Sequence, residues 1–504
     1  MLKISSKKLK LCTYAFLYVN IFIFLFGFLK IYIALPAAAI CGVAIYLNLR
    51  NTKESFFTIS RTMLITAVVT MGLVLIAAGH GGICSQLMDW SARNAILRDL
   101  IDKPWPVYYS DGSALSYYIG YFILPGAAGK LIGFNAAYWL MYLYGLYGMV
   151  LIYLYLVKLL KADNTKKQVV ILLMLFLFAN CESLKVIAMD IWTGLMRYSN
   201  PSYSHAGVMI GFTPFYTLYA TVFNQIIPAF LVLSMLLSDK DDLGGIAVAA
   251  VPLLLYSPFQ IIFIFVIAVI AAVKLLLKTD LKESVKRIFT IENIAVLLVL
   301  TPLLLLYIWG NITGEKPDVL KFHKLNYSKH WGTYFIFIIT QVVLYAALLF
   351  RRFYKNPYFI AAAVGLIILP LFQWGLYNDL CTRTSSVGLF IFMVLIMKQW
   401  FEPETVQAAK PKNNKALNIP NADRLCSAVL AILVGFSAIK PMGEALTAIT
   451  SGSSNFANHN VSDNLCDPFG TLEGIENQNL IDFKYNFFAF DAKNDTFFKV
   501  LARR

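Results

Sequence analysis

Charged residues are scarce in this sequence. Only 14% of its 504 residues are Asp, Glu, Lys or Arg, whereas 59% are hydrophobic, and the mean hydropathy is +0.66. Soluble domains carry about 25% charged residues, so this composition excludes an ordinary soluble protein. The apolar runs are long enough for helices of about 20 residues, the length that crosses a bilayer. The predicted fold class is therefore an all-α polytopic membrane protein.

Sequence motifs for metal binding, disulfide bonding and secretion are missing as well. The seven cysteines contain no CxxC pair and no paired spacing, so neither a zinc site nor a disulfide framework is indicated. Lys3, Lys7, Lys8 and Lys10 precede the first apolar run, but no small-residue cleavage site follows it. We therefore expect a first membrane helix here instead of a removed signal peptide.

Basic residues outnumber acidic ones, 43 against 28, which gives a net charge of +15. They occur in short clusters between apolar runs, a pattern typical of loops on the cytoplasmic side and not of a continuous basic surface. We expect no nucleic-acid partner. The alternation of clusters and apolar runs predicts about 13 transmembrane helices, with the N-terminus cytoplasmic and the C-terminus extracytoplasmic.

Two apolar runs are too long for a single crossing. The run Leu11–Leu49 is expected to form a hairpin that breaks near Pro36. The run Gly244–Lys278 is expected to split at Ser257 and Pro258. Both predictions use proline as the residue that ends a helix.

The basic clusters also constrain the remaining segments. Tyr117–Gly133 is predicted to be juxtamembrane or re-entrant, because a crossing there would place the basic cluster after Lys158 on the outer side. The predicted division is an N-terminal transmembrane hairpin with a basic loop (1–61), a transmembrane module (62–400) with its first outer loop at 80–134, a cytoplasmic linker (401–424), a last transmembrane helix (425–440) and a short extracytoplasmic tail (441–504).

The first outer loop concentrates polar, aromatic and acidic residues. Its SARNAILRDLI stretch has apolar residues on one helical face and charged residues elsewhere, a pattern typical of a helix at the membrane surface. The apolar positions are Ala92, Ile96, Leu97 and Leu100, and the charged positions are Arg93, Arg98 and Asp99. Nearby aromatics such as Tyr117 and Tyr118 are residue types that settle at headgroup level. We expect any chemistry to begin in this loop.

The predicted topology places every histidine on the outer side or at its boundary. These residues are His80, His205, His323, His330 and His459. Asp89, Asp190 and Asp379 fall on the same side. An outer cavity lined by such groups is where a membrane enzyme works, whereas a proton-coupled transporter carries ionisable groups within its spans. Loop location alone also explains the distribution, because loops carry polar residues, so both interpretations remain open.

Several motifs between residues 80 and 390 occur in an order that resembles a known family. A span is followed by an outer loop with an acidic residue, an Arg-containing surface helix, a WP pair and a YYxGY segment that ends in GKLxG, as in the GT-C glycosyltransferases. More closely, the chain resembles a group of large, poorly characterised membrane proteins of Gram-positive bacteria. The elements that carry this resemblance are DWSARNAILRDLIDKPWPV, LSYYIGYFILPGAAGKLIG, AMDIWTG, FNQIIPAF, LYSPF and YNDLCTRTS.

The resemblance implies a GT-C-like transmembrane module and an inverting glycosyltransferase that uses a polyprenyl-phosphate sugar on the outer face of the membrane. It implies that Asp89 is the general base, because an acidic residue of the first outer loop has this role in that fold. Asp190 matches a second acidic residue that assists a metal or the acceptor. These motifs contain no DxD pair, so a divalent metal ion as cofactor stays an open question.

The residues expected to bind substrate are Arg93, Arg383, Asp379, His205, Tyr117 and Tyr118. Arg93 or Arg383 is expected to hold the lipid phosphate, because a guanidinium grips phosphate through two parallel hydrogen bonds. An arginine that merely snorkels to the interface is the competing interpretation for both. Asp379 precedes Arg383 by one helical turn, so it either orients that arginine through an ion pair or is a helix N-terminal charge.

Two other functions remain open at this stage. The same aromatics and arginines suit a flippase or exporter of lipid-linked cell-envelope precursors, although the nearly uncharged spans and the lack of a visible internal repeat argue against it. The second alternative is a noncatalytic scaffold. The expected location is the bacterial cytoplasmic membrane. The expected partners are a polyprenyl-phosphate-linked sugar, an acceptor (a cell-surface glycan, teichoic acid, lipid or protein) and membrane lipids.

Overall fold

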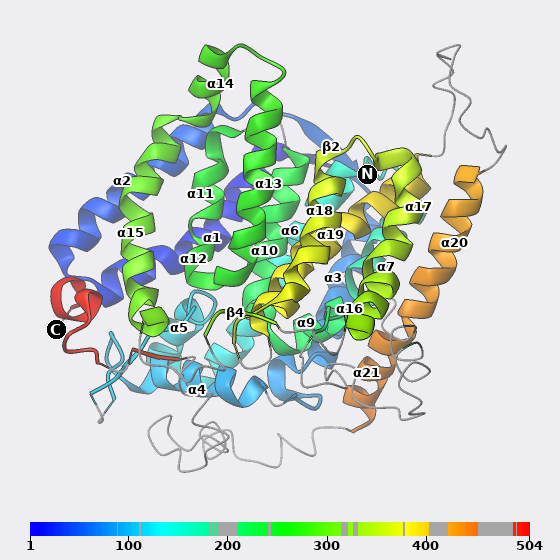
Figure 1. The fold of residues 1–504 in the computed structure, drawn as a ribbon. Helices are drawn as coiled ribbons and strands as arrows, with labels where there is room; N and C mark the ends of the chain where they lie inside the picture. Colours follow the sequence, from blue (N-terminus) through cyan, green and yellow to red (C-terminus); the bar gives the residue numbers. More distant parts are fainter. Residues whose placement is uncertain are drawn as a thin grey trace. The chain divides into compact units, whose positions relative to one another are not determined.

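The computed structural model describes residues 1–87, 89–109, 112–180, 184, 188, 210–239, 243–313, 321–325, 331–375, 378–402, 422–451, 487–489 and 491–503. Within them the chain is almost entirely helical, with three two-stranded antiparallel sheets (Figure 1). It forms two compact units. Unit 1 comprises Met1–Tyr155, Thr217–Lys321 and Ala445–Arg504, and unit 2 comprises Leu156–Tyr216 and Phe322–Glu444.

Eight of the described helical segments are long and apolar enough to cross a membrane. They are Ser6–Phe28, Ile31–Asn51, Phe134–Leu159, Pro258–Leu276, Ile291–Ile312, Trp331–Phe353, Asp379–Phe401 and Ala422–Thr450. Shorter apolar segments are Arg61–Ala77, Ile123–Ile132, Phe223–Ser238, Leu243–Tyr256 and Pro357–Leu371. The chain is therefore an all-α, multi-pass membrane protein, and the larger number of crossings stays a prediction.

Unit 1 contains most of the elements. In chain order they are β1 (Leu2–Ser5), α1 (Ser6–Phe28), α2 (Ile31–Asn51), β2 (Phe56–Ile59), α3 (Arg61–Ala77), the 3₁₀ turn η1 (His80–Gly82), α4 (Asp89–Asp102), β3 (Ala114–Leu115), α5 (Ile123–Ile132), α6 (Phe134–Leu159), α9 (Phe215–Thr221), α10 (Phe223–Ser238), η2 (Leu243–Gly245), α11 (Ile246–Ala250), α12 (Leu253–Tyr256), α13 (Pro258–Leu276), α14 (Leu281–Ile288), α15 (Ile291–Thr313), β6 (Phe488–Ala489) and the π-helical turn η7 (Phe497–Leu501). Helices α6 and α9 each run across a unit boundary.

The first apolar run forms the predicted hairpin, but the predicted break at Pro36 is wrong. Helix α1 ends at Phe28 and α2 begins at Ile31, with extended residues between them. Pro36 lies inside α2. The buried face of α2 consists mainly of small residues three or four positions apart, which allows α1 and α15 to pack closely against it. We attribute the continuity of the helix to this packing, which outweighs the one hydrogen bond that proline removes.

The second predicted break is confirmed. Helix α12 ends at Tyr256, Ser257 leaves the helical conformation with φ −153°, and α13 starts with Pro258 at its first position. A proline costs little there, because the first N–H groups of a helix have no intrahelical partner. Helix α5 has only 10 residues, or about 15 Å, against about 30 Å of bilayer core. This length agrees with the predicted juxtamembrane position of Tyr117–Gly133.

The two ends of unit 1 carry different segments (Figure 1). Strand β1 pairs with β2 from Leu2↔Ile59 to Ser5↔Phe56, which places the N-terminal strand beside the loop after α2, and α14 lies at the same end. Helix α4 and β3 lie at the opposite end, where β3 pairs with β6 of the C-terminal tail. The basic segments Arg50–Arg61 and Lys278–Arg287 thus share one end, and the first outer loop shares the other with the tail, in agreement with a topology that places both basic segments on one side. Which end faces the cytoplasm stays a prediction.

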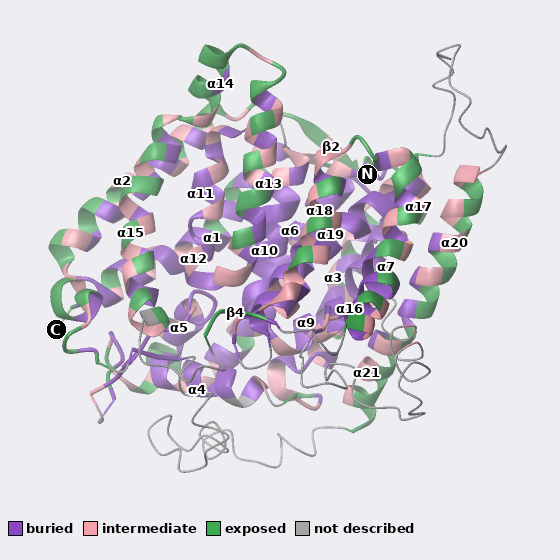
Figure 2. Cartoon of the chain, in the orientation of Figure 1, coloured by how far each residue is buried: buried purple, intermediate pink, exposed green. Residues whose placement is uncertain are grey.

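Unit 2 is arranged around α19. Its elements are α7 (Thr165–Leu177), β4 (His323–Lys324), α16 (Trp331–Ile338), the π-helical turn η4 (Ile339–Val343), α17 (Leu344–Phe353), α18 (Pro357–Ile368), η5 (Leu369–Leu371), β5 (Phe372–Gln373), α19 (Asp379–Phe401) and α20 (Ala422–Ser437), with α21 (Ile439–Thr450) at its boundary. Helices α7, α17, α18 and α20 all contact α19, which is buried along nearly its whole length (Figure 2). The short sheet β4–β5 lies just before its start.

Candidate functional site

Helix α4 begins at Asp89, the predicted general base. The periodicity predicted a helix here, and four of its apolar residues are fully buried: Trp90, Ile96, Leu97 and Leu100. A carboxylate in the first turn is stabilised by the positive end of the helix dipole. The Asp89 side chain is 36% exposed, so a fixed helix presents a carboxylate that solvent can reach.

Arg93 lies one turn after Asp89, and its side chain is only 3% exposed. The sequence placed it among the charged positions away from the apolar face, yet it is buried. Its Nη1 donates to the Tyr117 hydroxyl at 2.5 Å, and its Nη2 lies 4.0 Å from Asp89 Oδ1. The ring of Tyr118, which is half-buried, contacts that of Tyr117 with centroids 3.5 Å apart. The structure therefore brings four of the predicted site residues together.

A network of neutral polar groups extends from α4 to the end of α3. Gln86 Nε2 donates to the Gly79 carbonyl at 2.6 Å and also to the Tyr138 hydroxyl. Asn94 Nδ2, on the buried side of α4, donates to Gln86 Oε1 at 3.1 Å. Gly79 has φ +98°, and a Cβ there would lie 2.9 Å from Trp90 Nε1, so only glycine fits. This network fixes the start of α4, and no sequence motif predicted it.

His80 is fully buried among aromatic rings at the same place. Its ring centroid lies 5.0 Å from that of Trp90 and 4.4 Å from that of Phe223. Burial lowers the pKa of His80 to about 3, although a backbone interaction with Tyr219 acts in the opposite direction. The imidazole is therefore neutral at physiological pH. It packs behind α4 and is not an exposed acid or base.

Several buried polar atoms around this cluster have no hydrogen-bond partner among the described residues. They are Trp90 Nε1, Arg93 Nε, Asn94 Oδ1 and the side-chain amides of Asn224 and Gln225. The last two residues follow Phe223, whose ring stacks on Trp90 with centroids 4.6 Å apart. Buried groups of this kind usually bind water or a ligand. The sequence reasoning missed both amides, although a polar pair inside the apolar run FNQIIPAF was the available signal.

Tyr117 is held in place by a segment far away in the sequence. The Ser116 N–H donates to the Phe487 carbonyl at 2.9 Å, and the Phe487 ring lies 4.7 Å from that of Tyr117. On the other side, Ser116 Oγ donates to the Tyr307 carbonyl of α15 at 2.7 Å. Tyr117 is 2% exposed as a result. Its contact with Arg93 therefore depends on the C-terminal tail.

A second pair of predicted residues meets within unit 2. Asn378, with φ 52°, accepts from the Cys381 N–H at 3.2 Å and caps α19. The first turn of that helix then brings Arg383 Nη2 to 2.8 Å from Asp379 Oδ1, and each side chain is 12% exposed. The predicted ion pair is confirmed. Gly375 has φ +86° and lies so close to Asp379 that a Cβ would come within 2.7 Å of Oδ2.

The remaining predicted residues are Asp190 and His205, and both lie outside the described residues. The Asp89 group belongs to unit 1 and the Asp379–Arg383 pair to unit 2. Within the part of the chain that the structure describes, no three His, Cys, Asp or Glu side chains gather in a way that could hold a metal ion. The question of a metal cofactor stays open.

Comparisons with protein families, with curated proteins and with solved structures found no match.

Proposed function

We propose that the protein is a membrane glycosyltransferase. It transfers a sugar from a polyprenyl-phosphate donor to a glycan, teichoic acid, lipid or protein acceptor on the outer face of the bacterial cytoplasmic membrane. The proposal starts from the resemblance of the sequence motifs to the GT-C enzymes. The observation that supports it best is the arrangement of Asp89, a partly exposed carboxylate fixed at the start of a buried helix.

Asp89 has the properties that a general base needs. A base must reach the proton that it removes, and it must be held in one orientation. Exposure of 36% provides access, while Arg93 behind the carboxylate and Tyr117 behind Arg93 limit its motion. Asp89 thus lies beside a buried arginine. Asp102, at the other end of α4, instead forms an exposed ion pair with Arg98.

The proposed reaction is a single displacement. Asp89 accepts the proton of the acceptor hydroxyl, and the oxygen attacks the anomeric carbon of the donor sugar. The bond from that carbon to the phosphate oxygen breaks, and the electron pair leaves with the polyprenyl phosphate. The configuration at the anomeric carbon inverts, and most of the rate enhancement comes from positioning and from stabilisation of the leaving phosphate.

The two arginines receive different roles. Arg93 is 3% exposed and already donates to Tyr117, so we assign it to position Asp89. Arg383, in unit 2, is 12% exposed and pairs with Asp379 at 2.8 Å; because the sequence resemblance implies a phosphate-binding arginine, its planar guanidinium is the proposed ligand of the lipid phosphate. Tyr118, half-buried beside Tyr117, is proposed to contact the substrate.

An assay of sugar transfer tests the function. The purified protein is incubated with a panel of polyprenyl-phosphate sugars and an acceptor mixture, and product is measured by mass spectrometry. The Asp89→Asn variant should lose about 10² to 10⁴ in rate, the usual effect of removing a general base. The matched control is Asp102→Asn on the same helix, which should transfer at close to the wild-type rate.

The possible outcomes separate the proposal from its alternative. Transfer by the wild type and by Asp102→Asn but not by Asp89→Asn, with equal donor binding in all three, supports the assignment. Equal transfer by all three proteins shows that another residue is the base. If the wild type moves the lipid-linked sugar between leaflets of proteoliposomes and forms no product with any donor, it is a flippase and the transferase proposal is wrong.

A further inference from the structure

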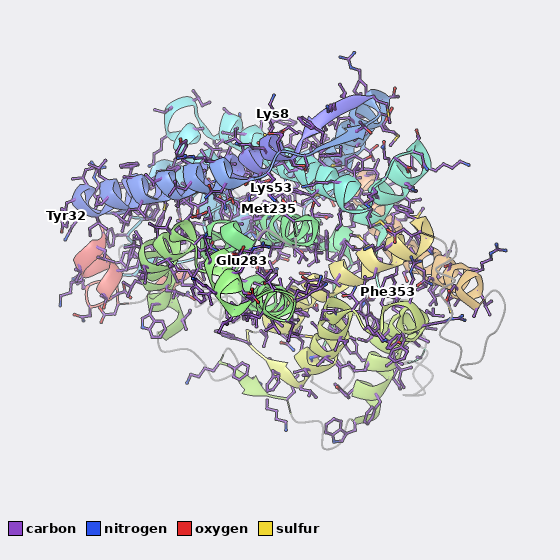
Figure 3. All side chains as sticks on the ribbon, turned by 90° about the horizontal axis from the view of Figure 1, so that it is seen from above. Lys8, Tyr32, Lys53, Met235, Glu283 and Phe353 are labelled. Carbon is purple, nitrogen blue, oxygen red and sulfur yellow. The ribbon has the colours of Figure 1, made fainter. Side chains whose placement is uncertain are left out.

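A cavity of about 590 Å³ lies at the end of unit 1 that carries the β1–β2 pair. It is formed where β1, the first turns of α1, the last turn of α2 and the start of β2 meet. Three lysines line it: Lys3, Lys7 and Lys8. Figure 3 looks down on this end and shows Lys8 pointing outward from the start of α1. The cavity is separate from the Asp89 group, which lies at the opposite end of unit 1.

The cavity carries an excess of positive charge. Among the described residues, Glu54 is the only acidic one that lines it, and its carboxylate accepts a hydrogen bond from Ser5 Oγ. None of the three lysines forms an ion pair with a described residue. The Lys3 ammonium lies 4.2 Å from the centroid of the Phe56 ring, which places it over the apolar wall of the cavity. The cavity lining thus carries three positive charges and one negative charge, and the negative carboxylate already accepts a hydrogen bond from Ser5.

The backbone adds to this positive potential. Lys7 and Lys8 lie in the first turn of α1, which contains no acidic residue. The N–H groups at the start of a helix carry partial positive charge, so both lysines are placed where the dipole opposes them. An anion bound among the lysines would offset this repulsion.

The other wall of the cavity is apolar. It consists of Leu11, Leu49 and Phe56, of which Leu11 is 50% and Phe56 54% exposed. Leu11 and Leu49 belong to α1 and α2, two of the segments long enough to span the membrane. The wall therefore continues into the bilayer, while the lysines lie at the ends of the spans, at the level of the lipid headgroups.

We propose that this cavity binds one anionic phospholipid. The lipid phosphate lies among Lys3, Lys7 and Lys8, and an acyl chain lies along Leu11 and Leu49. The positive charge selects an anionic headgroup over a zwitterionic one. The apolar wall selects a lipid over inorganic phosphate, which has nothing to place against the leucines. This site does not depend on the proposed transferase reaction.

Native mass spectrometry of the full-length protein in detergent tests the proposal. Delipidated protein is titrated with phosphatidylglycerol, and in a parallel titration with phosphatidylcholine. Phosphatidylglycerol should fill one site tightly, and the double variant K7Q/K8Q should bind it about thirtyfold more weakly, because two basic residues near the anionic headgroup are lost. The double variant K7R/K8R should retain the affinity, which shows that K7Q/K8Q fails through charge.

The matched control is K282Q/K286Q, which removes two exposed lysines from α14 at the same end of unit 1. It should bind phosphatidylglycerol like the wild type. An equal loss in the control would show that net charge alone attracts the lipid, and the proposed site would be wrong. Equal affinity for phosphatidylcholine would also overturn it. Displacement of the lipid by millimolar inorganic phosphate would identify a simple anion site instead of a lipid site.

Discussion

At the scale of single residues, the Asp379–Arg383 ion pair gives the most direct test of phosphate binding. Arg383→Lys keeps the charge but loses the planar fork, so the transfer rate should fall by about tenfold to hundredfold, the effect of losing one charge-assisted hydrogen bond. Arg287→Lys is the matched control, because Arg287 also pairs with a carboxylate at 2.8 Å, on the exposed helix α14. Rates come from the same transfer assay. Full activity of Arg383→Ala would remove this residue from the site.

His80 gives a prediction for the dependence of stability on pH. Its pKa falls from 6.5 to about 3 on folding. Between these values the unfolded state binds a proton that the folded state does not, so stability rises with pH and falls on acidification. The loss should be about 1.4 kcal/mol per pH unit below pH 6.5, or about 2 kcal/mol at pH 5.

Thermal unfolding in detergent at pH 7 and pH 5 measures this effect. The wild type should lose more stability on acidification than His80→Phe, which keeps an aromatic ring against Trp90 and Phe223. His323→Phe, at an exposed position, serves as the control and should follow the wild type. If His80→Phe and the wild type respond equally to pH, His80 is not a buried neutral imidazole.

The candidate residues differ in how far the sequence could identify them. Asp379 and Arg383 are one helical turn apart, so a local rule predicted their ion pair. Asp89 was identified by its position after a span. The contact between Arg93 and Tyr117 was not predictable, because it joins two segments whose approach depends on tertiary packing. Asn224 and Gln225 were missed for a different reason, because they form a polar pair within an apolar run that could have been noticed in the sequence.

At the scale of elements, a single substitution in the C-terminal tail can test whether the tail positions Tyr117. Phe487→Ala removes the ring that lies 4.7 Å from Tyr117. The transfer rate should fall about threefold to tenfold, the usual value of an aromatic pair, because Tyr117 and with it Arg93 are less well held. Val500→Ala, at a 51% exposed position of the same tail, should have no effect. Wild-type transfer by Phe487→Ala would show that the tail does not position the site.

The elements also show where local rules succeed. Proline at 258 starts α13, as predicted, because the first position of a helix tolerates it. Proline at 36 was expected to end a helix and does not. The difference lies in the small-residue face of α2, which has buried alanines on both sides of that proline and which allows α2 to pack against α1 and α15. Such a stabilisation by neighbours cannot be read from one segment.

At the scale of the whole molecule, the sequence correctly predicted an all-α, multi-pass membrane protein, because a bilayer requires about 20 apolar residues per crossing. Eight of the described helical segments are long and apolar enough to cross, and the number of about 13 stays a prediction. The pairing of β3 with β6 was not predictable from the sequence, since the two strands are short and lie far apart in the sequence. Two-residue strands have no pattern of their own.

The sidedness of the two ends can be measured by cysteine accessibility in a background whose native cysteines are replaced. Lys493→Cys, in the tail, should react with an impermeant maleimide added to intact cells. Lys166→Cys and Lys282→Cys, at the starts of α7 and α14, should react only after the membrane is permeabilised, because both belong to basic clusters between apolar runs, which are expected to be cytoplasmic. Labelling of Lys166→Cys from outside would mean that Tyr117–Gly133 crosses the membrane.

The pairing between β3 and β6 also has a consequence for the order of events during synthesis. Ribosomes make Ala114 and Leu115 early and Phe488 and Ala489 only after all the described spans. A nascent chain therefore inserts its helices while Tyr117 still lacks the ring of Phe487. The contact of Tyr117 with Phe487 can form only after translation has passed residue 487, so a chain interrupted before that point lacks the ring that packs against Tyr117 in the Asp89 group.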